Sequence, residues 1–132
     1  MGSSLGFDFG THKIGIAVGQ SVTGTASPLI TLSYIKQKPD WEGIERIIGE
    51  WQPDILVVGL PYQMDDQEAE LAVRAKRFAR QLEGRYKLPV EMVDERLTSR
   101  EAINRLGKKS ARDVTLVDSM AAKLILETWL NK

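Results

Sequence analysis

The chain has 132 residues, 42% of them hydrophobic and 27% charged, which is typical of a single soluble globular domain spanning residues 1–132. It contains no cysteine, so disulfides and thiolate metal sites are excluded. No apolar run approaches the roughly 18 residues that a membrane span needs, and a strand pattern follows the first four residues at once. We therefore expect a cytoplasmic protein with no signal peptide and no membrane partner.

The net charge of zero hides an uneven distribution of charged residues. Residues 74–112 carry 12 basic and 5 acidic side chains, a net charge of +7, and the rest of the chain carries −7. A local basic face can bind a polyanion whatever the total charge of the protein. This asymmetry indicates nucleic acid as a partner.

The first half of the chain predicts three strands, a helix and a fourth strand. Apolar patterns indicate strands over 5–9 and 13–19, joined by a turn, and a third over 29–35 after a break at Ser27-Pro28. Asp40 is a suitable N-cap for a helix that carries apolar residues at helical spacing up to Trp51. The apolar run at 54–61 then predicts a strand that is buried on both faces.

The second half predicts three helices and one more strand. An apolar stripe indicates a long helix over 67–83, ended by Gly84, and the fifth strand follows at 88–95. Thr98 and Glu101 form a capping box at the start of a further helix, and a last helix covers 114–130. This order of elements predicts an α/β fold with a mixed sheet that helices cover on its faces.

Asp8 stands out because it lies in the middle of the first predicted strand. Strands disfavour aspartate, and a buried carboxylate needs a cation or a hydrogen-bond donor. On its face of the strand the neighbours are Gly6 and Gly10, which leave space for another backbone or a ligand to come close. The sequence therefore leaves two interpretations open, a carboxylate that caps a neighbouring helix and a carboxylate that binds a metal.

Two further acids occupy unusual places. Asp118 lies on a helix face that is otherwise apolar and mostly small, although it could also be an early-turn residue that interacts with the helix dipole. Asp94 and Glu95 end a strand, where open α/β sheets bind ligands, although the pair could also form a surface ion pair with Arg96. Such carboxylates suit Mg²⁺, and two Mg²⁺ ions can hold both the attacking and the leaving oxygen of a phosphodiester.

Four motifs in order along the chain resemble those of the YqgF family, also called RuvX-type resolvases, of the RNase H-like superfamily. They are "DFGTHKIGIAVG", "VVGLPYQMDD", "DERLTS" and "VDSMAAKLIL". The resemblance implies an RNase H-like fold, with a mixed five-stranded sheet flanked by helices on both faces. It also implies that Asp8, Glu95 and Asp118 are the catalytic residues and ligate Mg²⁺ or Mn²⁺.

The resemblance implies a metal-dependent nuclease that hydrolyses phosphodiester bonds by a two-metal-ion mechanism, without a covalent enzyme intermediate. The family was first connected with Holliday junctions and later with the 5′ end of the 16S rRNA precursor. Symmetric cutting of a junction requires two active sites and hence a dimer. Because one core accounts for all the apolar stripes, we expect a monomer or weak homodimer and favour structured RNA over branched DNA as the substrate.

Several other residues are candidates for contact with nucleic acid. Lys13 takes the place of an arginine that is common in the family, and the basic tract of the family survives in the loop before the last helix. We expect phosphate contacts from Lys13, Lys108, Lys109 and Arg112.

The turn after Asp8 and the long helix carry residues with two possible roles each. Thr11 could contact a phosphate and His12 could transfer a proton, but both could also serve only the turn. The arginines at 74, 77 and 80 recur every three residues, which favours a solvated helix face.

Two other classes of function remain open at this point. Actin-like ATPases and sugar kinases also begin with an Asp-x-Gly motif, but they close two domains over ATP, and this chain is too short for a second domain. A non-catalytic nucleic-acid-binding module is the other alternative. Three clustered carboxylates argue against it, because without a metal they repel one another.

Overall fold

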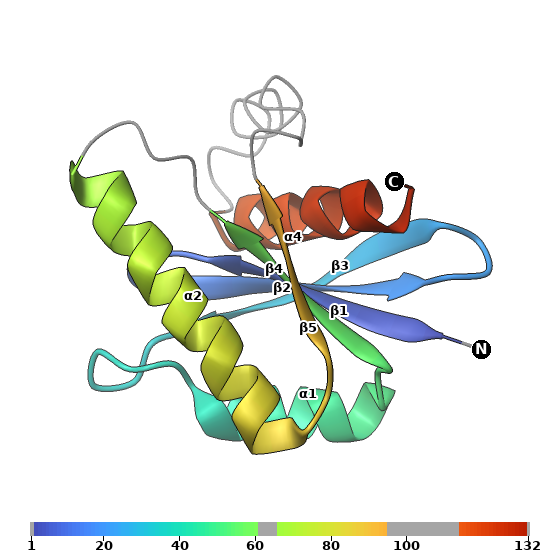
Figure 1. Ribbon diagram of the computed structural model, residues 1–132, viewed down its shortest axis with the longest axis horizontal. Coiled ribbons are helices and arrows are strands. Elements are labelled where there is room, and N and C mark those ends of the chain that lie inside the picture. Colours follow the sequence, from blue (N-terminus) through green and yellow to red (C-terminus); the bar gives the residue numbers. More distant parts are fainter. Residues whose placement is uncertain (1, 61–65, 95–113, 132) are drawn as a thin grey trace.

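The computed structural model describes residues 2–60, 66–94 and 114–131. Five strands form one mixed sheet in the order β3-β2-β1-β4-β5 (Figure 1). Strand β2 runs antiparallel to β1 and β3, whereas β1, β4 and β5 are parallel to one another. The elements are β1 (Ser3–Phe9), β2 (Lys13–Gln20), β3 (Thr25–Ser33), α1 (Trp41–Trp51), β4 (Ile55–Leu60), α2 (Asp66–Tyr86), β5 (Val90–Asp94) and α4 (Val114–Leu130).

The described helices cover both faces of the sheet. Helices α1 and α2 lie on one face, and α4 crosses the other (Figure 1). The alternation of β1 divides the core accordingly, because Phe7 and Phe9 pack with Phe78 of α2, while Gly6 faces α4. The predicted mixed five-stranded sheet, flanked on both faces, is confirmed.

No helix in the described ranges has the length and apolar character that crossing a membrane requires.

Two predicted boundaries are wrong for physical reasons. Strand β3 begins at Thr25 and runs through Pro28, because β3 is an edge strand and Leu29 is the extra residue of a bulge opposite β2. Helix α2 continues through Gly84 to Tyr86, and its left-handed cap is Lys87, whose φ is 57° and whose N–H donates to the Glu83 carbonyl.

The other predicted elements agree with the structure to within a few residues, apart from the helix after Thr98, which lies outside the described residues. Asp40 caps α1 as expected, since its carboxylate accepts a hydrogen bond of 3.0 Å from the Gly43 N–H.

Helix α4 packs unusually close to the sheet. A Cβ placed on Gly6 would lie 2.9 Å from the Leu126 Cβ and 3.1 Å from the Ala122 carbonyl oxygen. On β2, a Cβ on Gly19 would lie 2.8 Å from the Leu126 Cδ2. Gly6 therefore sets the distance between α4 and the sheet, because its added Cβ would meet the helix backbone, and Gly19 makes room for the Leu126 side chain.

The carboxyl end of α4 is held by polar contacts to β5 and to the turn between β2 and β3. The Trp129 Nε1 donates to the Glu91 carboxylate of β5 at 2.7 Å, and Asn131 Nδ2 donates to the Gly24 carbonyl at 2.9 Å. Together with the contact at Gly6, these bonds fix how far α4 lies along the sheet.

We predict that Gly6→Ala lowers the free energy of unfolding by about 1–3 kcal/mol, because its methyl group forces α4 away from the sheet. Gly84→Ala is the control, since nothing lies within 4 Å of its added Cβ. Gly84 lies in the last turn of α2, so this change is expected to raise the free energy of unfolding by at most about 1 kcal/mol. Urea denaturation measures both, and an unchanged midpoint for Gly6→Ala contradicts the close contact.

Candidate active site

The carboxyl ends of three parallel strands lie together and form one edge of the sheet, across the strand direction, where a ligand is expected. Strands β1, β4 and β5 end at Phe9, Leu60 and Asp94. The pairing of Phe7 with Val58, and of Leu60 with Asp94, brings these ends to one edge (Figure 1). Open α/β sheets bind ligands just outside such carboxyl ends.

Asp8 is half-buried near this edge, on the face that α4 covers. Its partner on β2 is Gly15, and the pairing of Phe7 with Val58 puts Gly59 of β4 in the next row beside it. With Gly6 and Gly10 on its own strand, Asp8 therefore has glycine as its nearest neighbour in all four directions on that face. This local lack of side chains suits the close approach of a ligand.

The backbone of α4 leads toward Asp8. Its contacts move from Gly19 to Gly6 as the helix is followed backward from Leu130 through Leu126 to Ala122. Asp118 comes four residues before Ala122, about 6 Å along a helix, and Asp8 lies two strand residues, about 7 Å, beyond Gly6.

The helix face predicted to carry Asp118 is the one that packs on the sheet. Ala121, Ala122 and Ile125 are all buried there. The described course of α4 thus places the backbone of Asp118 near the level of Asp8, although the Asp118 side chain lies outside the described residues.

Several predicted site residues cannot be placed. Glu95 and the basic loop residues Lys108, Lys109 and Arg112 lie outside the described residues. Within the described ranges, no three acidic or histidine side chains gather into a group that could hold a metal ion. Glu95 and the side chain of Asp118 are not among the described residues, so the predicted carboxylate cluster stays a prediction.

The turn between β1 and β2 places the two accessory candidates at the same edge. Thr11 and His12 are both exposed, and Lys13 begins β2 half-buried. The turn is tight, because the Gly10 N–H donates to the Lys13 carbonyl at 3.0 Å. The His12 carbonyl accepts from the Tyr34 N–H at 2.9 Å. Thr11 and His12 are therefore held on a fixed turn with their side chains toward solvent.

Tyr34 is a residue of this edge that the sequence analysis missed. Its hydroxyl donates to the Gly10 carbonyl, which joins the segment after β3 to the β1–β2 turn. Burial raises the pKa of Tyr34 to about 12, and the nearby Arg74 guanidinium partly opposes that shift. A tyrosine just after an edge strand gives no sign in the sequence of this long-range bond.

The arginines of α2 differ in their surroundings. Arg77 and Arg80 are exposed, as the prediction of a solvated helix face requires. For Arg74 that prediction is wrong, because Arg74 is half-buried and its Cζ lies 5.8 Å from the centre of the Phe9 ring. A cation over an aromatic ring is held by the negative face of the ring.

Comparison with known proteins identifies relatives over the whole chain. The family model described as "RuvX: Holliday junction resolvase" matches residues 2–132. A protein of Aeromonas salmonicida named "Putative pre-16S rRNA nuclease" is 48% identical, with 98% of this chain and 95% of that protein covered. A protein of the same name from Marinobacter nauticus is 52% identical, with 97% and 92% covered.

Solved structures resemble the fold at much lower identity. Thermus thermophilus RuvC in complex with a Holliday junction superposes with a TM-score of 0.54 at 14% identity, covering 98% of this chain and 94% of RuvC. The fowlpox virus resolvase with its junction DNA gives 0.53 at 11% identity, covering 98% and 99%. At such identities the likeness concerns the fold, and it confirms the RNase H-like architecture expected from the motifs.

We predict that Tyr34→Phe lowers the free energy of unfolding by about 0.5–1.5 kcal/mol at neutral pH, because the Gly10 carbonyl loses its donor. The pKa of Tyr34 is higher in the folded chain than in the unfolded chain, so its neutral form stabilises the fold. That contribution is complete below pH 10 and is lost as the pH rises toward about 12.

Denaturation of wild type and Tyr34→Phe across this alkaline range tests the assignment. The wild type is expected to lose stability more steeply than the variant. Parallel curves for the two proteins would show that Tyr34 titrates with an ordinary pKa.

Proposed function

Because this chain belongs to the RuvX family, we propose that it is a metal-dependent nuclease that hydrolyses phosphodiester bonds in the precursor of 16S rRNA. The observation that carries this proposal is identity near one half, over nearly the full length, to proteins named "Putative pre-16S rRNA nuclease". Processing of a ribosomal RNA precursor would take place in the cytoplasm, on structured RNA. Strand alternation, the course of α4 and the glycines around Asp8 are the structural support.

Asp8, Glu95 and Asp118 are the proposed metal ligands and catalytic residues. Asp8 contributes a carboxylate at a position that four glycines leave open. Helix α4 brings the backbone of Asp118 toward it. Val93 of β5 packs on the α4 face, and β5 ends at Asp94. We assign Glu95, the next residue in the sequence, as the third ligand because the family motif "DERLTS" carries it.

The donor set fits a hard divalent cation. Carboxylate oxygens with room for retained water are what Mg²⁺ and Mn²⁺ prefer, and this chain has no cysteine to favour a softer metal. When bound, two such ions would stabilise the charge that develops on the phosphate and lower the pKa of the attacking water. The proposed role of the protein is to hold three carboxylates close together near the carboxyl ends of the strands.

Basic and polar side chains around the edge would position the substrate. We assign phosphate contacts to Lys13 at the start of β2 and to Lys108, Lys109 and Arg112, which precede α4 in the sequence. On the exposed turn, the Thr11 hydroxyl could donate to a phosphate oxygen, and the His12 imidazole could carry a proton to the leaving 3′-oxygen.

A Holliday junction is the second candidate substrate, because the family model carries the name of a junction resolvase. The two substrates make different demands on assembly. Paired cuts across a four-way junction need two active sites in a two-fold dimer, whereas trimming of an RNA end needs one. The monomer or weak homodimer that we expect from the sequence would therefore favour the RNA.

We predict that purified protein with Mn²⁺ or Mg²⁺ cuts an RNA that carries the 5′ leader of 16S rRNA faster than it cuts a four-way DNA junction. Asp8→Asn is expected to reduce cleavage at least about a hundredfold, since a lost metal ligand removes several kcal/mol of transition-state stabilisation. The matched control is Asp54→Asn. Asp54 is exposed and lies just before the start of β4, at the opposite end of this strand from the proposed site.

Denaturing gels of labelled substrates measure both rates. Preference for the junction would transfer the proposal to DNA recombination. Equal cleavage by wild type and Asp8→Asn would refute the assigned site, and no cleavage of either substrate by wild type would favour a non-catalytic binding module.

We predict that saturating Mn²⁺ raises the thermal midpoint of wild type, because only the folded chain brings the ligands together. At a metal concentration about 100 times the dissociation constant, the stabilisation is about 2.7 kcal/mol. Asp8→Asn should lose most of this shift and Asp54→Asn should keep it. Scanning calorimetry with and without metal measures the shift, and equal shifts in all three proteins would place the metal elsewhere.

A further inference from the structure

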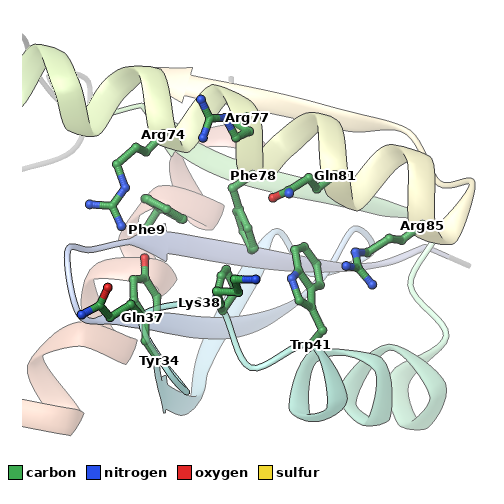
Figure 2. Close-up of a pocket in the computed structure, with 11 residues that line it drawn as sticks. Phe9, Tyr34, Gln37, Lys38, Trp41, Arg74, Arg77, Phe78, Gln81 and Arg85 are labelled. Atoms are coloured by element: carbon green, nitrogen blue, oxygen red, sulfur yellow. The ribbon is translucent and has the colours of Figure 1, made fainter.

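A groove on the face opposite α4 is not used by the proposed chemistry. It has a volume of about 360 Å³ and lies between α2, the start of α1 and the segment after β3 (Figure 2). Its floor is formed by Phe9 and Phe78, which are buried, and the half-buried rings of Tyr34 and Trp41 stand beside them. The volume is in the range of pockets that hold small organic ligands or a nucleotide.

The aromatic side chains of the groove form a continuous row. The Phe9 and Phe78 ring centres are 5.1 Å apart, those of Phe78 and Trp41 are 5.5 Å apart, and Tyr34 lies 6.1 Å from Phe9 at the other end. These packed rings give the groove a rigid apolar floor. Because these rings are already packed, the protein would lose little conformational entropy when a flat ligand binds there.

Arginines hold the rim of the groove. The Arg85 Cζ lies 4.0 Å from the centre of the Trp41 ring, and the Arg74 Cζ lies farther from its ring, 5.8 Å from the centre of Phe9. Arg77 and Lys38 add two exposed cations, and none of the described residues that line the groove is acidic. Four cations around an apolar floor select for a ligand that is both anionic and aromatic.

The groove reaches the edge where the proposed catalytic residues lie. A second hollow of about 570 Å³ shares Tyr34 and Arg74 with it and is lined by Thr11 and His12. Those two residues follow Asp8 by three and four positions, on the turn that leaves β1. A chain that passes over this turn could therefore contact the catalytic edge and the groove at once.

We propose that this groove binds unpaired nucleotides of the substrate, next to the bond that is cut. This inference rests on the proposed function, since it assigns a place to the single-stranded part of a nuclease substrate. The phosphates pair with Arg77 and Lys38, and the bases lie against the guanidinium groups of Arg74 and Arg85, which are held near the rings of Phe9 and Trp41.

The side chains that line the groove favour a single-stranded nucleic acid over a duplex. Bases within a duplex are stacked on one another and present no face to a protein, whereas unpaired bases can stack on arginine or aromatic groups. The exposed amides of Gln37 and Gln81 also line the groove and can bond to base edges, which are free only in an unpaired strand. The groove thus predicts a protein that prefers single-stranded flanks.

The test is the binding of fluorescein-labelled oligouridine to Asp8→Asn protein without metal, followed by anisotropy. Arg77→Gln combined with Arg85→Gln is expected to weaken binding about tenfold, and to lower the slope of log K against log salt by about 0.7 for each phosphate that the variant no longer neutralises. Arg80→Gln is the matched control, an exposed arginine of the same helix that does not line the groove, and should change binding less than about twofold.

A second readout places the ligand. Oligouridine should quench tryptophan fluorescence in the Asp8→Asn protein, and Trp41→Phe should remove the quenching while Trp51→Phe keeps it. Arg77→Gln alone guards against misfolding, because Arg77 is exposed. Equal binding by the groove variants and Arg80→Gln, or stronger binding of a duplex of equal length, would overturn the inference.

These outcomes are separate from those of the cleavage assay. Binding that depends on the groove, in a protein that cuts nothing, would leave the groove in place and remove the nuclease. The converse outcome is cleavage that depends on Asp8, while the groove variants leave oligouridine binding and KM unchanged. That outcome would support the nuclease and reject the groove.

Discussion

The close contact between α4 and Gly6 is the constraint on which the rest of the site depends. Strand β1 carries Asp8 one residue before its carboxyl end, and the carboxylate is useful only if something packs beside it without covering it. Because Gly6 has no side chain, α4 can lie directly on the strand, with Ala122 and Leu126 against the glycine. The same contact fixes the level of Asp118 along β1. A larger residue at position 6 would both destabilise the domain and displace one proposed ligand from another.

Alternation along β1 gives its final residues opposite tasks. Asp8 faces α4, and Phe9 faces α2, where it forms part of the aromatic floor of the groove. The chain then turns sharply through Gly10, whose carbonyl is held by Tyr34, a residue that also lines the groove. The turn, the carboxylate and the groove are therefore parts of one rigid unit. A substrate that binds on one side of this unit is positioned relative to the other.

The elements and the face of Asp8 could be predicted from the sequence, because both follow from short-range periodicity. Alternation placed Asp8 and Gly6 on one face, and the structure agrees. The predicted break at Ser27-Pro28 is wrong because an edge strand tolerates proline. Whether a strand lies at the edge is a property of the whole sheet. Gly84 was misjudged because packing of α2 outweighs a helix penalty of about 1 kcal/mol. Arg74 of α2 lies over Phe9 of β1, and spacing within a helix cannot show a partner on a strand.

The distribution of charge now has a structural meaning. In the described residues, three arginines of α2 line the groove, whereas Asp8 lies on the opposite face of the sheet, the face that α4 covers. A polyanion is repelled by carboxylates and attracted by arginines, so a metal must offset the first effect while the groove supplies the second. Arginines set apart from the carboxylates serve this better than arginines among them, since ion pairs would neutralise both. On this argument, the proposed groove contributes to the binding of substrate and the proposed metal to its cleavage.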